Sequence, residues 1–218
     1  MGGKTGINTG AGKNLVGAFH PPAAVLADTD ALAGLPEAEF RSGLAEVVKC
    51  GFIADGAILD LLDDDPTGRT ATEELVTRAV QVKADAVGED LYDLGRREFL
   101  NYGHTLAHAI ERVEDFGWRH GEAVAVGLVF AAELAGQAGL LDRPAVDRHR
   151  ELVAAMGLPT SYAGDWAQLQ AVMRVDKKAR GASLRFVVLD GLGSPTILTD
   201  PDQAWLDAAW AAVSGGNA

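Results

Sequence analysis

The sequence predicts a mainly helical protein with a few short strands and a late β-hairpin. Three observations carry this prediction. Apolar residues recur at helical spacing through most of the chain, glycine and proline separate these segments, and two short strand-like runs flank a glycine turn near the C-terminus. With 218 residues, 48% of them hydrophobic and 23% charged, the chain can bury one substantial core or two small ones.

The first elements are predicted from apolar spacing and end signals. Residues 23–28, an apolar run after two prolines, indicate a buried strand. Helical periodicity predicts a helix over residues 36–53. A second helix is expected over residues 70–87, opened by a capping box of Thr70 and Glu73.

The later helices follow the same signals. A broad apolar stripe predicts one helix over residues 96–113. The next, over residues 122–138, is apolar around most of its circumference, so we expect it to be a buried central helix. Two more helices are predicted over residues 144–156 and 166–175. The late hairpin is expected over residues 184–199 and a closing helix over residues 202–213.

Charge and composition restrict the function. The net charge of −12 and the pI near 4.7 argue against nucleic acid as a partner. Cys50 is the only cysteine, no signal-like start is seen, and no run reaches the roughly 18 apolar residues of a membrane helix, so we expect a cytoplasmic protein. The acidic residues 63–65 are interpreted as a solvated loop rather than a cation site.

Histidines form the densest group of residues with chemical potential. His104 and His108 are four residues apart, so on a helix both project from one face, and His120 lies at the start of the next helix. An antiparallel helix pair would bring the three together, and imidazoles with one carboxylate are a common zinc set with an open coordination position. The spacing leaves the carboxylate unnamed and His108 an equal candidate ligand. His20 and His149 lack such neighbours and are expected to be structural or surface residues.

Basic residues form a second group, which in an acidic protein favours a local anion site. Its members stand beside glycine, asparagine or a helix end: Lys4, Lys13, Lys49, Lys83, Arg97, Lys177 and Lys178. Glycine-rich residues 2–5 and 10–14 add backbone donors for phosphate or carboxylate. A P-loop ATPase is excluded, because Ile7 stands where that motif needs glycine and Asn14 where it needs serine or threonine.

Five segments in order resemble the 3-dehydroquinate synthase family, namely residues 2–8, 12–19, 43–49, 101–111 and 120–124. The resemblance covers essentially the whole chain. It implies a helical metal- and substrate-binding domain over residues 36–218, with residues 1–35 joining it to an N-terminal NAD-binding domain. The family's glycine-rich nucleotide-binding loop has no counterpart in this sequence. Asp93 stands where the family often has glutamate, Ala107 where it often has glycine, and Cys50 where it often has an aromatic residue.

The resemblance also implies residue roles. It makes Glu46, His104 and His120 the ligands of a zinc or cobalt ion, and His108, Lys49 and Asp93 catalytic residues. A small phosphorylated keto-acid would be held by Lys4, Asn14, Lys83, Arg97, Asn101 and Lys178, with Lys177 as the alternative to the last. NAD would be faced by Lys13, Ala31, Leu32, Ala33 and Gly34.

The activity implied is the NAD- and metal-dependent conversion of 3-deoxy-D-arabino-heptulosonate 7-phosphate to 3-dehydroquinate and phosphate, a step of the shikimate pathway. Without the groups that cradle the NAD pyrophosphate, we expect little activity from this chain alone. Alternatives are a related sugar-phosphate cyclase, a non-catalytic metal-binding module, or half of a split enzyme completed by a separate NAD-binding chain. A metal-dependent alcohol dehydrogenase is disfavoured by the lysine and arginine group. A homodimer remains open.

Overall fold

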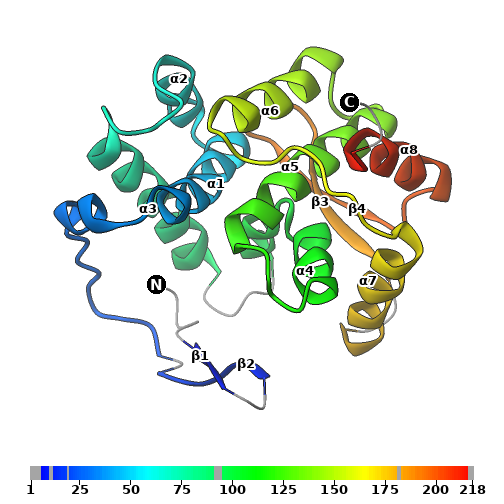
Figure 1. The fold of residues 1–218 in the computed structure, drawn as a ribbon, viewed down its shortest axis with the longest axis horizontal. Coiled ribbons are helices and arrows are strands. Elements are labelled where there is room, and N and C mark those ends of the chain that lie inside the picture. The colour runs from blue at the N-terminus through cyan, green and yellow to red at the C-terminus, as the bar shows by residue number, and fades with distance from the viewer. Residues whose placement is uncertain (1–5, 10–11, 19, 91–94, 181–182, 216–218) are drawn as a thin grey trace.

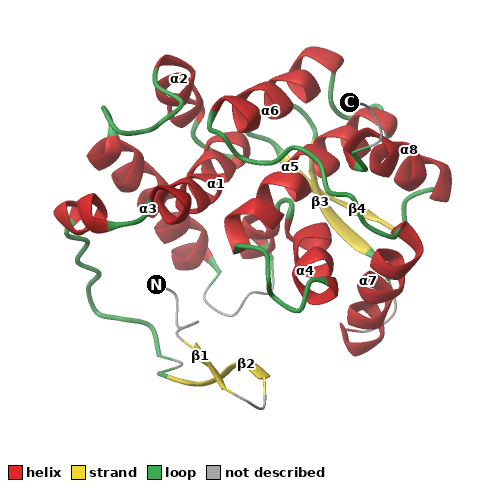
Figure 2. Ribbon diagram, viewed as in Figure 1, coloured by secondary structure: helices red, strands yellow, loops and turns green. Residues whose placement is uncertain are grey.

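The computed structural model describes residues 6–9, 12–18, 20–90, 95–180 and 183–215, and it is mainly helical (Figures 1 and 2). The α-helices are α1 Glu37–Ile53, α2 Gly56–Asp64, α3 Thr72–Glu89, α4 His104–Val113, α5 His120–Gln137, α6 Arg143–Ala155, α7 Trp166–Arg180 and α8 Gln203–Val213. Two 3₁₀ helices are η1 Thr29–Gly34 and η2 Arg96–Asn101. Two antiparallel hairpins pair β1 Gly6–Thr9 with β2 Gly12–Gly17, and β3 Arg185–Leu189 with β4 Pro195–Thr199.

Helix α5 is the centre of the fold, as predicted. Every residue from Ala123 to Ala135 is buried, and α5 packs against α1, α4, α6, α8 and β3 (Figure 1). The one carboxylate in this stretch, Glu133, accepts hydrogen bonds from Arg143 at 2.9 Å and Arg150 at 3.0 Å, which offsets the cost of its burial. Among the described residues, no helix is both long and apolar enough to cross a membrane.

Two glycines let α5 touch its neighbours backbone to backbone. A Cβ on Gly121 would lie 1.9 Å from the Ser42 carbonyl oxygen in α1, and the Gly121 N–H donates to the Ser42 hydroxyl at 3.0 Å. A Cβ on Gly127 would lie 2.0 Å from the carbonyl oxygen of Gly103, just before α4. The residues beside these contacts, in α1, α4 and α5, are therefore held at close range.

The predicted helix over residues 96–113 is wrong as a single element. Its apolar stripe is real, but η2 ends at Asn101 and α4 begins at His104. Between them Gly103 has φ +78°, a left-handed conformation that an L side chain rarely adopts, and its carbonyl packs against Gly127. The break makes His104 the first residue of a helix.

Two other predictions near the N-terminus are corrected. Residues 23–28 form no strand, and Val25 and Leu26 are 48% and 97% exposed. Helix α3 begins at Thr72 without a side-chain cap, because the Thr70 hydroxyl donates instead to Asp65, at 2.8 Å. The local hydrogen bond to Asp65 closes a turn before α3 and competes with the predicted capping box.

The acidic run belongs partly to a helix that the sequence analysis missed. Asp63 and Asp64 end α2, and Asp63 pairs with Arg148 of α6 at 2.5 Å.

The first hairpin, β1 with β2, was also not predicted. The late hairpin and the helices near residues 36–53, 144–156 and 202–213 are confirmed, whereas α7 continues to Arg180, past its predicted end.

His149 is a structural residue, as expected. Its ring is fully buried and stacks on Phe52, with ring centroids 3.6 Å apart. Nδ1–H donates to the Ala145 carbonyl at 2.7 Å, and Nε2 accepts a hydrogen bond from the Tyr102 hydroxyl at 3.0 Å. Burial lowers the pKa of His149 to about 4, so the ring is neutral in the fold at neutral pH.

We expect His149 to make the fold less stable as the pH falls. Because the unfolded ring takes up a proton near its ordinary pKa of about 6.5, its contribution is complete above that pH and is lost between about 6.5 and about 4. Between pH 7 and pH 5 the loss should be about 2 kcal/mol of unfolding free energy, measurable by urea denaturation. The double variant Tyr102→Phe, His149→Phe is the control. It removes the titrating ring together with its hydroxyl partner, so neither group is left buried and unpaired. An equally large loss in that variant would contradict the assignment.

Candidate metal centre and anion pocket

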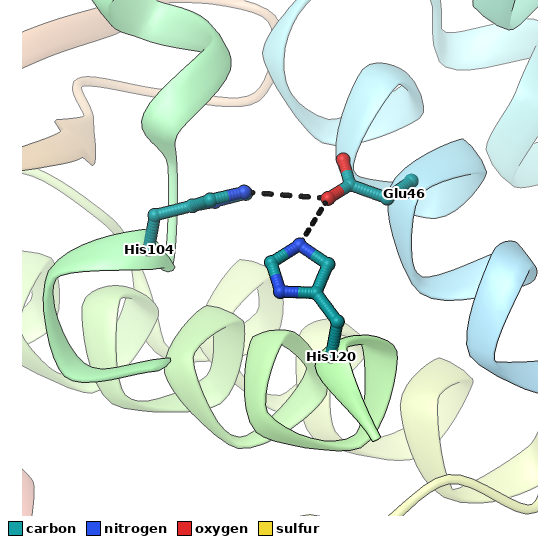
Figure 3. Close-up of side chains that lie close together, drawn as sticks. All are labelled: Glu46, His104 and His120. Carbon is teal, nitrogen blue, oxygen red and sulfur yellow. Dashed lines mark hydrogen bonds and ion pairs between the residues drawn. The ribbon is translucent and has the colours of Figure 1, made fainter. Parts of the chain in front are cut away.

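Three helices bring Glu46, His104 and His120 to one point (Figure 3). Glu46 lies in α1, whereas His104 and His120 are the first residues of α4 and α5. The Glu46 Oε1 atom is 3.3 Å from His104 Nε2 and 3.1 Å from His120 Nε2. The ligand atoms of the three residues all lie within 4.8 Å of one another. The three residues form a candidate ligand set of two imidazole nitrogens and one carboxylate oxygen.

The far nitrogens of both rings are already engaged. His104 Nδ1–H donates to the Tyr102 carbonyl at 3.0 Å, and His120 Nδ1 lies 3.3 Å from Glu111 Oε1. Because a carbonyl or carboxylate oxygen only accepts, both Nδ1 atoms carry a proton, and the Nε2 atoms face Glu46. Metal-binding histidines have this arrangement, and with no proton on Nε2 the two imidazole lone pairs and the Glu46 carboxylate would suit a divalent cation.

The charges of the site depend on one another. Burial by itself raises the pKa of Glu46, but hydrogen bonds from His104 and His120 and the charge of Lys49 outweigh it, so the pKa lies well below its ordinary value. Lys49 donates to the second oxygen, Oε2, of Glu46. Glu111 and then Glu46 raise the pKa of His120 to about 9. A metal must displace the proton from His120 Nε2.

His108 lies next to this set but outside it. Its ring centroid is 5.4 Å from that of His104 and 6.4 Å from that of His120, and its side chain is exposed. The three histidines thus gather on the packed helices α4 and α5, as the spacing indicated. Among the described residues the ligand set contains Glu46 rather than His108, which agrees with the family resemblance.

A pocket of about 520 Å³ opens beside the ligand set. It is lined by Glu46, Val47, Lys49, Cys50, Val76, Ala79, Val80, Lys83, Arg97, Leu100, Asn101 and His104. Two of its three cations, Lys49 and Arg97, are only 5% exposed. Four residues predicted for substrate or catalysis, from α1, α3 and η2, therefore share one pocket with two predicted metal ligands. Such a set of positive charges suits an anionic ligand.

Several predicted residues cannot be placed. Lys4 and Asp93 lie outside the described residues, and the structure describes only the backbone of Lys13, Asn14, Lys177 and Lys178. Ala31, Leu32, Ala33 and Gly34 belong to η1, directly before α1, and do not line the pocket described above.

Glu111 was missed as a site residue by the sequence analysis. It follows His104 by seven positions and His108 by three, so all three share one face of α4. That spacing was the signal that could have identified it.

The chain matches the family models of 3-dehydroquinate synthase. The C-terminal model matches residues 43–179 and the N-terminal model matches residues 1–42. The predicted domain division after residue 35 stays a prediction. Curated 3-dehydroquinate synthases from Arthrobacter sp., Thermobifida fusca and Streptomyces coelicolor are 59%, 56% and 58% identical over 98%, 99% and 98% of this chain. The chain spans only 61%, 60% and 60% of these relatives.

Solved structures of sugar-phosphate cyclases share the fold. One is 2-epi-5-epi-valiolone synthase from Streptomyces hygroscopicus subsp. jinggangensis with NAD+ and Zn2+ bound, which has a TM-score of 0.88 and 25% identity, covering 100% of this chain and 62% of that one. Another is 2-deoxy-scyllo-inosose synthase complexed with carbaglucose-6-phosphate, NAD+ and Co2+, with a TM-score of 0.78 and 27% identity over 95% of this chain and 61% of that one. The family models cover most of the chain, and its helical fold brings Glu46, His104 and His120 together. The chain therefore belongs to the 3-dehydroquinate synthase family.

Proposed function

We propose that the chain forms the metal- and substrate-binding part of an NAD- and metal-dependent 3-dehydroquinate synthase, a carbon–oxygen lyase acting on phosphates. Its substrate would be 3-deoxy-D-arabino-heptulosonate 7-phosphate. The observation that carries the proposal is the pocket that joins Glu46 and His104 to Lys49, Lys83 and Arg97. Relatives named for this activity, at 55–59% identity, support it.

Glu46, His104 and His120 would hold the metal, because their ligand atoms converge and both far nitrogens are hydrogen-bonded. Zinc or cobalt suits this nitrogen and oxygen set, and the related cyclases carry Zn2+ or Co2+. The bound metal would polarise the alcohol and ketone oxygens of the substrate as a Lewis acid, while NAD accepts and returns the hydride.

The chain's own residues would then hold and orient the substrate. The buried guanidinium of Arg97 and the ammonium of Lys83 face the pocket and would bind its anionic ends, together with Asn101. Lys49, buried beside Glu46, would donate to ring hydroxyls close to the metal. In a pocket with apolar walls such contacts are stronger than in water and fix the reacting geometry.

The remaining roles rest on the family resemblance. His108, one turn beyond His104, would act near the phosphate or in proton transfer, with Asp93 as a further catalytic residue. Lys4, Asn14 and Lys178 would complete the substrate contacts. Lys13 and residues 31–34 would face NAD.

A related sugar-phosphate cyclase is the second candidate, favoured by the structural matches to 2-epi-5-epi-valiolone synthase and to 2-deoxy-scyllo-inosose synthase, the latter solved with carbaglucose-6-phosphate. Sequence identity separates the two proposals: it is 25–27% to the solved cyclases but 55–59% to curated 3-dehydroquinate synthases. His108 also favours a 3-dehydroquinate synthase, since some cyclases of the superfamily replace that histidine.

Substrate-dependent phosphate release tests the activity. The chain would be given Zn2+ and NAD, alone and mixed with the part of the Arthrobacter relative that this chain does not span. We expect one equivalent of bound Zn2+ and phosphate release from 3-deoxy-D-arabino-heptulosonate 7-phosphate in the mixture, with glucose 6-phosphate as the control substrate. Release only in the mixture would support a separate NAD-binding part. Zn2+ binding without any release would favour the non-catalytic module, and faster release from glucose 6-phosphate would favour the second candidate.

A further inference from the structure

Glu111 is a buried carboxylate that the roles assigned above do not use. It lies in α4, and its side chain is 6% exposed. A carboxylate is costly to bury unless it is paired or hydrogen-bonded. Its Oε1 atom lies 3.3 Å from His120 Nδ1, the nitrogen that points away from Glu46. A buried charge therefore contacts the outer edge of a proposed metal ligand.

The two histidine ligands are held in different ways. His104 has a side chain only 11% exposed, and its Nδ1–H donates to a backbone carbonyl, that of Tyr102. The side chain of His120 is 45% exposed, so packing restrains its ring much less. The contact to Glu111 is its anchor on the side away from Glu46. Loss of one carboxylate would therefore free the orientation of His120 but not that of His104.

We propose that Glu111 is a positioning residue that fixes the ring orientation and the Nδ1–H tautomer of His120, and thereby strengthens metal binding at the site. The inference rests on the proposed metal centre. The carboxylate acts in two ways: it keeps the proton on Nδ1, so that Nε2 presents its lone pair to the metal, and its charge makes the imidazole a stronger donor.

Metal affinity of the whole chain tests the proposal. Zn2+ and Co2+ would be titrated in competition with a chromophoric chelator, and the visible absorption of the Co2+ form would report ligand geometry. We expect Glu111→Ala to weaken binding by about 10- to 100-fold and to alter the Co2+ spectrum. Glu111→Gln keeps an acceptor oxygen for Nδ1–H without the charge, so it should lose less affinity and keep the wild-type spectrum.

Glu114→Ala is the matched control. Glu114 follows α4 directly and accepts a hydrogen bond from the Tyr162 hydroxyl at 2.6 Å, and among the described residues it pairs with no histidine. We expect it to leave metal affinity unchanged, even if it lowers the melting temperature of the metal-free protein. A purely structural role for Glu111 would change the melting temperature in the same way and leave the Co2+ spectrum as it is.

The outcomes separate the two proposals. If the wild-type chain binds Zn2+ and both Glu111 variants have the same affinity and Co2+ spectrum as wild type, the positioning role is overturned. The proposed metal centre would still stand. If wild type itself binds no metal, the metal centre fails. Should Glu111→Ala not fold, Glu111→Gln decides: wild-type affinity in that variant would overturn the contribution of the charge.

Discussion

Gly121→Ala is expected to push α5 away from α1 and to disrupt the proposed metal site. The added Cβ would lie 1.9 Å from the Ser42 carbonyl oxygen and 2.6 Å from two other Ser42 backbone atoms, and backbone cannot rotate aside as a side chain can. His120 precedes Gly121 in α5, and Glu46 lies one turn beyond Ser42 in α1. Overpacking costs roughly 1–3 kcal/mol and occasionally more, and so close a clash with backbone should lie near or above about 3 kcal/mol. Urea unfolding and Zn2+ titration would both show the loss.

Gly43→Ala provides the control. Gly43 is next to Ser42 in the same helix, and a Cβ there meets nothing within 4 Å. Alanine should stabilise α1 by roughly 0.5–1 kcal/mol, because glycine is the poorer helix former. If Gly121→Ala has the same stability and Zn2+ affinity as Gly43→Ala, then α5 can move without disturbing the proposed ligands.

The Gly121 contact also shows where prediction from sequence stops. The spacing of His104, His108 and His120 sufficed to predict a helix pair that gathers imidazoles. It could not supply Glu46, which lies on a helix far away in sequence. Glu46 reaches the histidines because α1 and α5 meet at the Ser42–Gly121 backbone contact, which hydrophobic periodicity does not encode. The family resemblance supplied that residue, and in the structure its Oε1 atom lies 3.3 Å from His104 Nε2 and 3.1 Å from His120 Nε2.

Local competition explains the other errors. The apolar stripe over residues 96–113 continues across a break, because periodicity records which face is buried and not whether the backbone stays helical. Gly103 could have indicated the break, since glycine adopts the left-handed conformation readily, but the close approach of its carbonyl to Gly127 is a tertiary contact that periodicity does not show. Thr70 had two hydrogen-bonding options, and Asp65, five residues earlier, prevailed over the helix end.

Glu46→Gln should abolish tight metal binding. It removes the carboxylate on which both Nε2 atoms converge, so the loss of Zn2+ affinity should exceed the roughly 100-fold typical of an outer hydrogen-bond partner. The variant also leaves Lys49, whose side chain is 6% exposed, without its ion-pair partner. Since Glu46 itself is 38% exposed, the cost should be about 2 kcal/mol, below that of a fully buried pair. Chelator competition and urea unfolding measure the two effects.

The double variant Glu46→Gln, Lys49→Met separates folding from metal binding. Methionine fills a volume similar to that of the lysine stem and needs no counter-charge, so unfolding free energy should return toward the wild-type value. Zn2+ affinity should stay low, because His104 and His120 alone offer two ligands where a catalytic zinc site has three. Recovery of tight Zn2+ binding along with stability would show that Glu46 serves the fold and not the metal.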